Sequence, residues 1–320
     1  MKNKEELKIV FMGTPEFAVT ILEKIIQEEY QVVSVVTVPD KPAGRGQKLS
    51  ESAVKICAKN HNIPILQPIS LKDEDFVNTL QNLQADLFIV VAFRMLPKIV
   101  WEIPAMGTFN LHGSLLPQYR GAAPINWAII NGETETGVTT FMIDEKIDTG
   151  KILLKEKMTI GEEETAGELH DRMMVLGAEV VVNTIELLRK GEINATPQEE
   201  KELKPAPKIQ KQDCLLDFSM SVFELHNFIR GMSPYPTAWI WLEHKESKER
   251  KSLKIFRSTI HNTKENADIK LTEDNRKLFL ELYSGTLSLQ EVQLEGKKRM
   301  DTATFMLGFK VNEWRILLTV

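Results

Sequence analysis

Two side chains suited to acid–base and hydrogen-bond chemistry stand two positions apart in the segment Phe109–Gly121. On an extended strand, Asn110 and His112 project from the same face, so that a carboxamide and an imidazole lie side by side. The following Gly113–Pro117 cannot easily continue a strand and predicts a loop at its carboxyl end. Ligands of open α/β sheets bind at that end. The segment therefore predicts a ligand site; the alternative is a core strand that runs into a turn, with His112 buried and hydrogen-bonded.

A third polar group, Asp148, lies in the loop Ile147–Gly150 and completes a candidate catalytic set. A histidine beside a carboxylate exchanges protons near neutral pH. The Asn110 amide can donate a hydrogen bond to an oxyanion that forms at a carbonyl carbon. These groups indicate acyl transfer without a covalent enzyme intermediate. Ser114 suggests a serine hydrolase instead, but the Gly-x-Ser-x-Gly elbow of that class is missing from the sequence around it.

Composition and cysteine content are typical of a soluble globular protein from a reducing compartment. Of the 320 residues, 42% are hydrophobic and 27% charged, and no apolar run approaches the roughly 18 residues that span a bilayer. The charged stretch Met1–Leu7 lacks the apolar core of a secretory signal. Cys57 and Cys214 lie far apart, and neither shows metal-ligand spacing. We therefore expect a cytoplasmic protein with no disulfide framework and no metal.

The net charge of −5 argues against a nucleic-acid partner, but the charge is unevenly distributed. From Ile209 onward there are 17 Lys and Arg against 15 Asp and Glu, so the acidic excess lies earlier in the chain. A cationic loop is expected at 39–48, where Lys41, Arg45 and Lys48 are mixed with prolines and glycines. Such a loop suits closure on an anionic partner such as a phosphate backbone. The alternative is an ordinary solvated loop.

The first half of the chain predicts an α/β domain with a mostly parallel, Rossmann-like sheet. Leu7–Phe11 and Val32–Thr37 are predicted strands that flank a helix with Thr14 as its N-cap and Pro15 as its first residue. Only Gly13 stands where a dinucleotide fingerprint needs three glycines, which argues against a nicotinamide-dependent dehydrogenase.

A crevice is expected between two successive strands of this sheet. The apolar strand predicted at 85–92 is followed by another at 108–112, and if they pair, residues 92–97 and 110–121 line one crevice. Two further strands, at 137–143 and 151–158, and a long helix between Thr165 and Gly191 follow.

The character of the chain changes after this helix. Glu192–Lys208 is rich in Pro, Lys and Glu, lacks periodicity and is the best linker candidate. Short alternating segments then predict a small β-barrel of the oligonucleotide-binding type. Its strands are expected at 215–218, 237–242, 253–259, 278–282, 286–292 and 315–319, and its helix at 222–230. We expect a catalytic domain over 1–190, a linker over 191–208 and a barrel domain over 209–320.

Several motifs carry a resemblance to a known family. They are Asn110-Leu-His112, Ser114-Leu-Leu-Pro117, Tyr119-Arg-Gly-Ala-Ala-Pro124, Gly132…Glu135-Thr-Gly137 and Ile147-Asp-Thr-Gly150. Together they resemble the folate-dependent formyltransferase family, densely over residues 9–150 and more thinly to about 240. Four further segments resemble the branch of that family whose acceptor is the methionine of charged initiator tRNA: 13–17, 39–46, 67–68 and 206–213.

The resemblance implies transfer of the formyl group of 10-formyltetrahydrofolate to the α-amino group of methionyl initiator tRNA, for translation initiation. It implies catalytic roles for Asn110, His112 and Asp148, and neither a metal nor an obligate protein partner. Folate contacts are implied for Ser114, Leu115, Leu116, Pro117, Phe93, Arg94 and Met95. Contacts with tRNA are expected at Arg45, Lys41 and Lys48 in the cationic loop and at Lys208 and Lys211 near the linker.

One departure from the family pattern concerns the predicted pterin loop. Many members carry an aromatic-Gly pair and one more residue before Leu-Pro, whereas this chain has Phe93-Arg-Met-Leu-Pro97. We therefore expect the pterin contacts to differ in detail, with Arg94 facing either the cofactor or solvent. Two alternatives stay open. One is a formyltransferase for another amine, such as a sugar nucleotide or glycinamide ribonucleotide; the other is a tRNA-binding protein whose crevice no longer catalyses.

Overall fold

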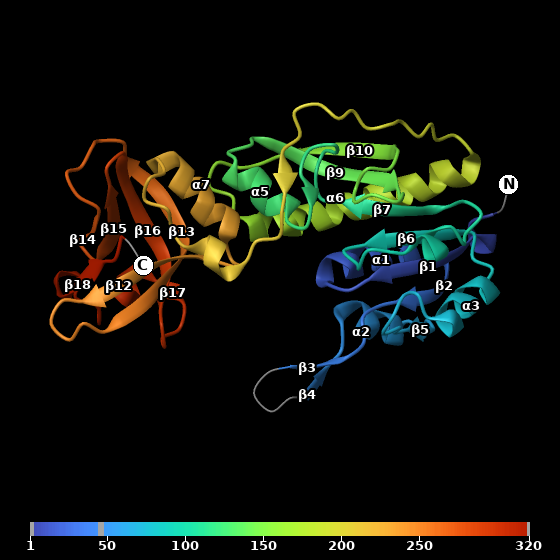
Figure 1. Cartoon of the computed structure of the whole chain (residues 1–320), viewed down its shortest axis with the longest axis horizontal. Helices are drawn as coiled ribbons and strands as arrows, with labels where there is room; N and C mark the ends of the chain where they lie inside the picture. The colour runs from blue at the N-terminus through green and yellow to red at the C-terminus, as the bar shows by residue number, and fades with distance from the viewer. Residues whose placement is uncertain (1–2, 44–47, 319–320) are drawn as a thin grey trace. The chain divides into compact units, whose positions relative to one another are not determined.

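The computed structural model describes residues 3–43 and 48–318 (Figure 1). The chain forms two compact units, and each draws on separate stretches of sequence. The first consists of 1–121, 136–158 and 170–205, and the second of 122–135, 159–169 and 206–320. Within the described residues, no helix has both the length and the apolar character needed to cross a membrane.

The first unit is built on a seven-stranded sheet with the order β10-β9-β7-β6-β1-β2-β5. Five of its strands run parallel: β1 (Lys8–Gly13), β2 (Gln31–Val36), β5 (Ile65–Leu66), β6 (Leu87–Val91) and β7 (Thr108–His112). β9 (Glu135–Met142) runs antiparallel to β7, and β10 (Ile152–Thr159) forms the edge beyond it. The Rossmann-like, mostly parallel sheet is thus confirmed.

The helices of this unit are α1 (Glu16–Gln27), α2 (Ala53–Asn60), α3 (Glu74–Asn82), α4 (Lys98–Trp101) and α6 (Ala166–Lys190). The long helix predicted between Thr165 and Gly191 is α6. The predicted start of α1 is wrong by one residue. Pro15 has an extended backbone, with φ −83° and ψ 178°, so Pro15 itself takes the N-cap position that we expected for Thr14.

Different helices cover the two faces of the sheet. On one face, Val10, Met12, Phe88 and Val90 pack in one core with α3 and α4, through residues such as Phe76, Leu80 and Val100. On the other face, α6 lies so close to β7 that a Cβ added to Gly177 would be 2.8 Å from the Leu111 side chain. Because side chains alternate along a strand, Asn110 and His112 point away from Leu111 and toward the α3 and α4 face.

The second unit is an antiparallel, nearly closed barrel with the strand order β14-β15-β16-β13-β12-β18. Its strands are β12 (Ala238–His244), β13 (Arg250–Asn262), β14 (Lys270–Asp274), β15 (Lys277–Leu282), β16 (Gly285–Leu294), β17 (Met300–Asp301) and β18 (Trp314–Ile316). The predicted strand at 215–218 makes only a single bridge, between Leu215 and Trp239. β14 and β17 were not predicted, because their polar, partly exposed residues show no alternation.

Two helices of the second unit pack against each other. In α5 (Pro124–Ile130) the Asn126 amide donates to the Gly231 carbonyl of α7 (Val222–Met232) over 2.7 Å. A Cβ on Gly231 would lie 2.6 Å from the Ile130 side chain, so this approach requires glycine. The remaining short elements are β3 (Lys41–Ala43), β4 (Lys48–Ser50), β8 (Arg120–Gly121), β11 (Pro205–Ala206), α8 (Thr302–Phe305) and the 3₁₀ turns Lys4–Glu6, Lys211–Cys214 and Val311–Glu313.

Candidate active site

Asn110 and His112 lie on β7, inside the first sheet. β7 pairs with β6 on one side and β9 on the other, and Asn110 stands opposite Val90 and Phe141. His112 is the last residue of the strand and is 6% exposed, whereas Asn110 is half-buried. The strand therefore presents a carboxamide and an imidazole on the same face, next to the point where the chain leaves the sheet.

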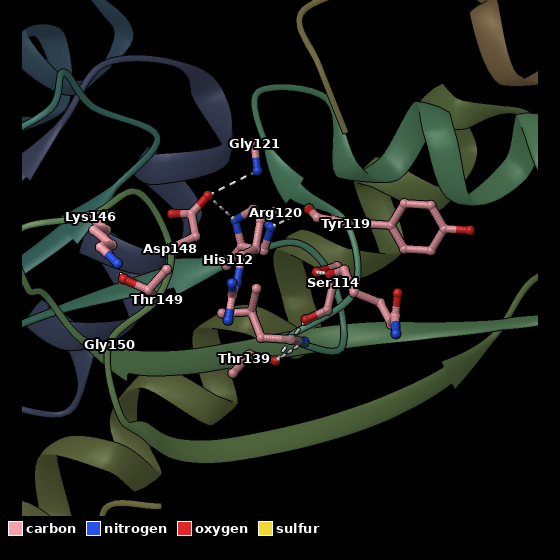
Figure 2. Close-up of polar contacts among 12 residues, drawn as sticks. His112, Ser114, Tyr119, Arg120, Gly121, Thr139, Lys146, Asp148, Thr149 and Gly150 are labelled. Atoms are coloured by element: carbon pink, nitrogen blue, oxygen red, sulfur yellow. Dashed lines mark hydrogen bonds and ion pairs between the residues drawn. The ribbon is translucent and has the colours of Figure 1, made fainter. Parts of the chain in front are cut away.

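The His112 ring lies between the Asp148 carboxylate and the Tyr119 carbonyl (Figure 2). Nε2 is 2.7 Å from the Tyr119 oxygen, and since a carbonyl only accepts, Nε2 carries the hydrogen. Nδ1 is then the nitrogen that faces Asp148, at 3.8 Å from Oδ2. This distance exceeds a hydrogen bond but allows an ion pair once the ring is protonated. The neutral ring thus directs the lone pair of Nδ1 toward the carboxylate.

The backbone that holds Nε2 is fixed in turn. Tyr119 has φ +60°, and its N–H donates to the Lys204 carbonyl over 2.7 Å. The Ser114 hydroxyl donates to the neighbouring Gln118 carbonyl over 2.6 Å. These contacts fix the loop after β7, so the tautomer and orientation of His112 are set by the fold.

Asp148 sits in a loop whose backbone is unusual. It has φ +56°, and its Oδ2 accepts a hydrogen bond from the Gly121 N–H at 3.0 Å. Two residues later, a Cβ added to Gly150 would lie 1.6 Å from the Met142 carbonyl, so only glycine fits there. The Asp-Thr-Gly sequence therefore has a steric reason: the loop turns directly against the end of β9.

Gln198 ties this loop to the strand that follows the His112 loop. Its Nε2 donates to the carbonyls of Asp148 and Gly150, at 2.9 and 2.8 Å. Its Oε1 accepts from Nε and an Nη of Arg120, at 3.1 and 2.8 Å. We predicted that Gln198 lies in a linker, and no local sequence pattern identified it as part of the site. The structure makes it a clamp on the Asp148 backbone.

One polar atom of the Asn110 side chain is buried and could still accept a hydrogen bond. Within the described part of the chain, its Oδ1 is buried and accepts no hydrogen bond. A buried acceptor without a partner costs free energy, and such atoms are exceptions that call for an explanation. A ligand that donates a hydrogen bond here, such as an amine, would satisfy it.

The Ser114–Pro117 segment is held by Thr139 of β9. The Thr139 hydroxyl donates to the Ser114 carbonyl at 2.7 Å and accepts from the Leu116 N–H at 3.1 Å. The side chains of Ser114 and Leu116 are fully buried, whereas Leu115 and Pro117 are partly exposed. A ligand of this segment would therefore meet Leu115, Pro117 or the backbone. The Ser114 hydroxyl, already engaged, is not placed as a nucleophile.

The arginine in the loop after β6 forms hydrogen bonds with the protein's own backbone. The Arg94 guanidinium donates to the carbonyls of Pro68 and Ile69, at 2.9 and 3.1 Å, and burial lowers the pKa of Arg94. Phe93 is partly exposed and Met95 is exposed. Arg94 thus points to the loop before α3. A ligand that binds beside the loop after β6 would therefore contact Phe93 or Met95 before it reached the Arg94 guanidinium.

The structure describes only some of the residues that we expect to contact tRNA. Arg45 lies outside the described residues, and of Lys48 only the backbone, paired with Ala43 in the β3–β4 ladder, is described. Lys41 is exposed on β3. Lys208 and Lys211 are exposed in the second unit.

The chain matches two family models. Residues 7–185 match the formyl transferase model, and residues 208–310 match the model of the formyl transferase C-terminal domain. Among curated relatives, the methionyl-tRNA formyltransferase of Flavobacterium johnsoniae is 50% identical over 97% of this chain and 98% of its own. That of Porphyromonas gingivalis is 49% identical over 97% and 98%.

Solved structures share the fold at lower identity. An N-formyltransferase from Helicobacter canadensis, in complex with folinic acid and dTDP-3-aminofucose, has a TM-score of 0.66 and 23% identity over 89% of this chain and 99% of its own. HypX from Aquifex aeolicus, in complex with tetrahydrofolic acid, has a TM-score of 0.63 and 16% identity over 94% of this chain and 47% of its own.

The chain therefore belongs to the formyltransferase family. Within that family it belongs with the methionyl-tRNA formyltransferases, which it matches along nearly its whole length.

Proposed function

We propose that the protein transfers the formyl group of 10-formyltetrahydrofolate to the α-amino group of methionine esterified to initiator tRNA. The observation that carries the chemistry is the set formed by the His112–Asp148 pair and the Asn110 carboxamide with its buried, unpaired Oδ1. The match to methionyl-tRNA formyltransferases supports this acceptor over a sugar nucleotide or glycinamide ribonucleotide.

The proposed step is a direct attack of the amine on the formyl carbon. A new bond forms between the amine nitrogen and that carbon, and the bond from the carbon to N10 of the folate breaks. The proton lost by the amine ends on N10, so the products are the formamide and tetrahydrofolate. No covalent enzyme intermediate is needed, in keeping with the engaged Ser114 hydroxyl.

Each polar group of the site has a proposed part in this step. Asn110 donates from Nδ2 to the developing oxyanion, while its free Oδ1 accepts from the attacking amine. His112, held through Nε2, presents Nδ1 as the atom that binds and releases the proton. Asp148 stabilises the charged ring and helps to relay the amine proton.

The folate and the tRNA are proposed to contact separate parts of the chain. Ser114–Pro117 and Phe93–Met95 would receive the folate, with Leu115 and Pro117 as the accessible side chains of the first segment. The cationic loop and the exposed Lys208 and Lys211 would bind the tRNA backbone. We retain the proposed division into a catalytic domain over 1–190, a linker over 191–208 and a tRNA-binding barrel over 209–320.

The test is to incubate the protein with 10-formyltetrahydrofolate and either charged initiator tRNA or an amino-sugar nucleotide, and to follow tetrahydrofolate. We expect turnover with charged initiator tRNA as the acceptor and none with the amino-sugar nucleotide. Asn110→Ala should lower kcat about 10²–10³-fold, corresponding to about 2.7–4 kcal/mol of barrier, with folate affinity little changed. Asn78→Ala, on the exposed surface of α3, is the matched control. An unaltered kcat in Asn110→Ala would remove Asn110 from the mechanism.

A further inference from the structure

A second cluster of chemically active side chains lies where α1 packs against α2 in the first unit. Cys57 of α2 and His61 at its C-cap are four residues apart, so both project from one helical face. Glu23 of α1 lies opposite them. Its Oε1 accepts from the Cys57 thiol at 3.2 Å, and its Oε2 is 2.9 Å from His61 Nε2.

The three side chains offer one thiol, one imidazole and one carboxylate to the same point. Their ligand atoms all lie within 4.8 Å of one another, and among the residues that the structure describes this is the one such group of three. Cys57 is buried, with 4% of its surface exposed. The side chains of His61 and Glu23 are about one third exposed, at 34% and 36%, so an ion can reach the cluster from solvent.

The three ligand types are ones that zinc accepts, at about 2.0–2.3 Å and in tetrahedral geometry. The shortest contacts, 3.2 Å from the Cys57 sulfur and 2.9 Å from His61 Nε2, run to different oxygens of the Glu23 carboxylate. An ion held by one of these oxygens therefore requires the carboxylate to rotate and the three side chains to adjust around it. A sulfur–nitrogen–oxygen set also favours zinc over magnesium or calcium, which prefer oxygen ligands alone.

Metal binding at this cluster has to displace the proton of the Cys57 thiol. The pKa of Cys57 is raised to about 12, first by burial and then by the hydrogen bond to Glu23, with a further contribution from the charge of Glu16. The thiol is therefore protonated in the free protein, beside two acidic residues. A bound dication reverses this balance, because it stabilises the thiolate and is attracted by the same carboxylates.

We propose that Glu23, Cys57 and His61 form a binding site for Zn²⁺ that joins α1 to α2. On binding, a sulfur–zinc bond replaces the sulfur–hydrogen bond, and the proton passes to solvent. Three protein ligands leave the fourth tetrahedral position for water. The site is separate from His112 and Asp148 and does not depend on the proposed formyl transfer. The sequence interpretation missed it because Glu23 is 34 residues away from Cys57 along the chain.

Cobalt titration of the metal-free, reduced full-length protein tests the proposal. Co²⁺ should produce a thiolate-to-metal charge-transfer band that saturates at one equivalent and disappears when Zn²⁺ is added. Cys57→Ser should abolish the band. Cys214→Ser is the matched control, because Cys214 is also buried but lies in the second unit, where its thiol donates to the Gln210 carbonyl.

The partly exposed ligands supply variants that keep the fold. His61→Ala and Glu23→Gln should each weaken Zn²⁺ binding by more than about 100-fold, while circular dichroism stays unchanged. Zn²⁺ should raise the Tm of the wild type and of Cys214→Ser but not that of Cys57→Ser. A wild type without the charge-transfer band, a band that survives in Cys57→Ser, or a His61→Ala variant with unchanged Zn²⁺ affinity would overturn the proposal.

Discussion

Replacement of Gln198 tests whether the position of Asp148 depends on a residue from the segment after α6. Gln198→Ala removes four hydrogen bonds: two to the carbonyls of Asp148 and Gly150 and two from Arg120. At about 1 kcal/mol for a typical hydrogen bond, the four together amount to about 4 kcal/mol of unfolding free energy. Because Gln198 is partly exposed, water replaces some of them, and we expect about 2 kcal/mol.

Gln198→Ala should also lower the rate of catalysis. Asp148 already faces His112 at 3.8 Å, and a displacement of about 1 Å can cost about 10²-fold in rate. We expect Gln198→Ala to lower kcat about 10–100-fold and to change the KM for 10-formyltetrahydrofolate little. The assay is steady-state formyl transfer to charged initiator tRNA, with urea unfolding run in parallel.

Gln198→Glu separates the two ends of the clamp. A carboxylate keeps the partner of Arg120 but has no hydrogen to give to the carbonyls of Asp148 and Gly150. Its kcat should fall as in Gln198→Ala, while part of the lost stability returns. Gln81→Ala, on the exposed surface of α3, is the control. A Gln198→Glu enzyme with wild-type kcat would refute the reasoning, because the carbonyl contacts would then be dispensable.

Two further predictions concern stability and tRNA binding. Hydrogen bonds from Arg189, Lys190 and Tyr30 lower the pKa of Glu186 to about 2, so its contribution to stability is fully present above the unfolded value near 4.5 and is lost as pH falls through about 2. Glu186→Gln should therefore destabilise the protein at pH 7, and urea unfolding at successively lower pH should show the difference from wild type shrinking; a constant difference would exclude the ion-pair explanation. For tRNA, affinity should fall steeply between low and moderate salt, and Lys208→Ala with Lys211→Ala should reduce the slope by about one to two. Binding measured by filter retention that is flat with salt would contradict phosphate contacts.

The sequence predicted the elements whose pattern is local. The strand Thr108–His112 has the predicted bounds, because its apolar neighbours alternate with polar residues and Gly113 ends it. The alternating barrel strands were recognised in the same way, whereas β14, with Lys270, Glu273 and Asp274 among its five residues, carries no such signal. Periodicity reports burial on one face, so strands with both faces partly solvated escape it.

The parts of the site that sequence could not give depend on contacts between distant residues. Gln198 acts 50 residues from Asp148 and 78 from Arg120, and its segment looks like a linker because clamping through backbone carbonyls requires no periodic pattern. Arg94 was left between cofactor and solvent, whereas its guanidinium meets the carbonyls of Pro68 and Ile69. Every residue has a backbone carbonyl, so the amino-acid sequence does not show which of them Arg94 contacts.

The interleaved composition of the two units has a consequence for synthesis on the ribosome. The second unit takes in 122–135 and 159–169, yet most of it begins at 206. Within it, the buried Arg230 donates to the carbonyls of Gly161 and Glu164, and Asn126 donates to Gly231. As the chain emerges, these early segments must therefore wait for α7 before their hydrogen bonds can form. A fragment that starts at 206 would lack these hydrogen bonds, so we expect it to be less stable than the same residues in the whole chain.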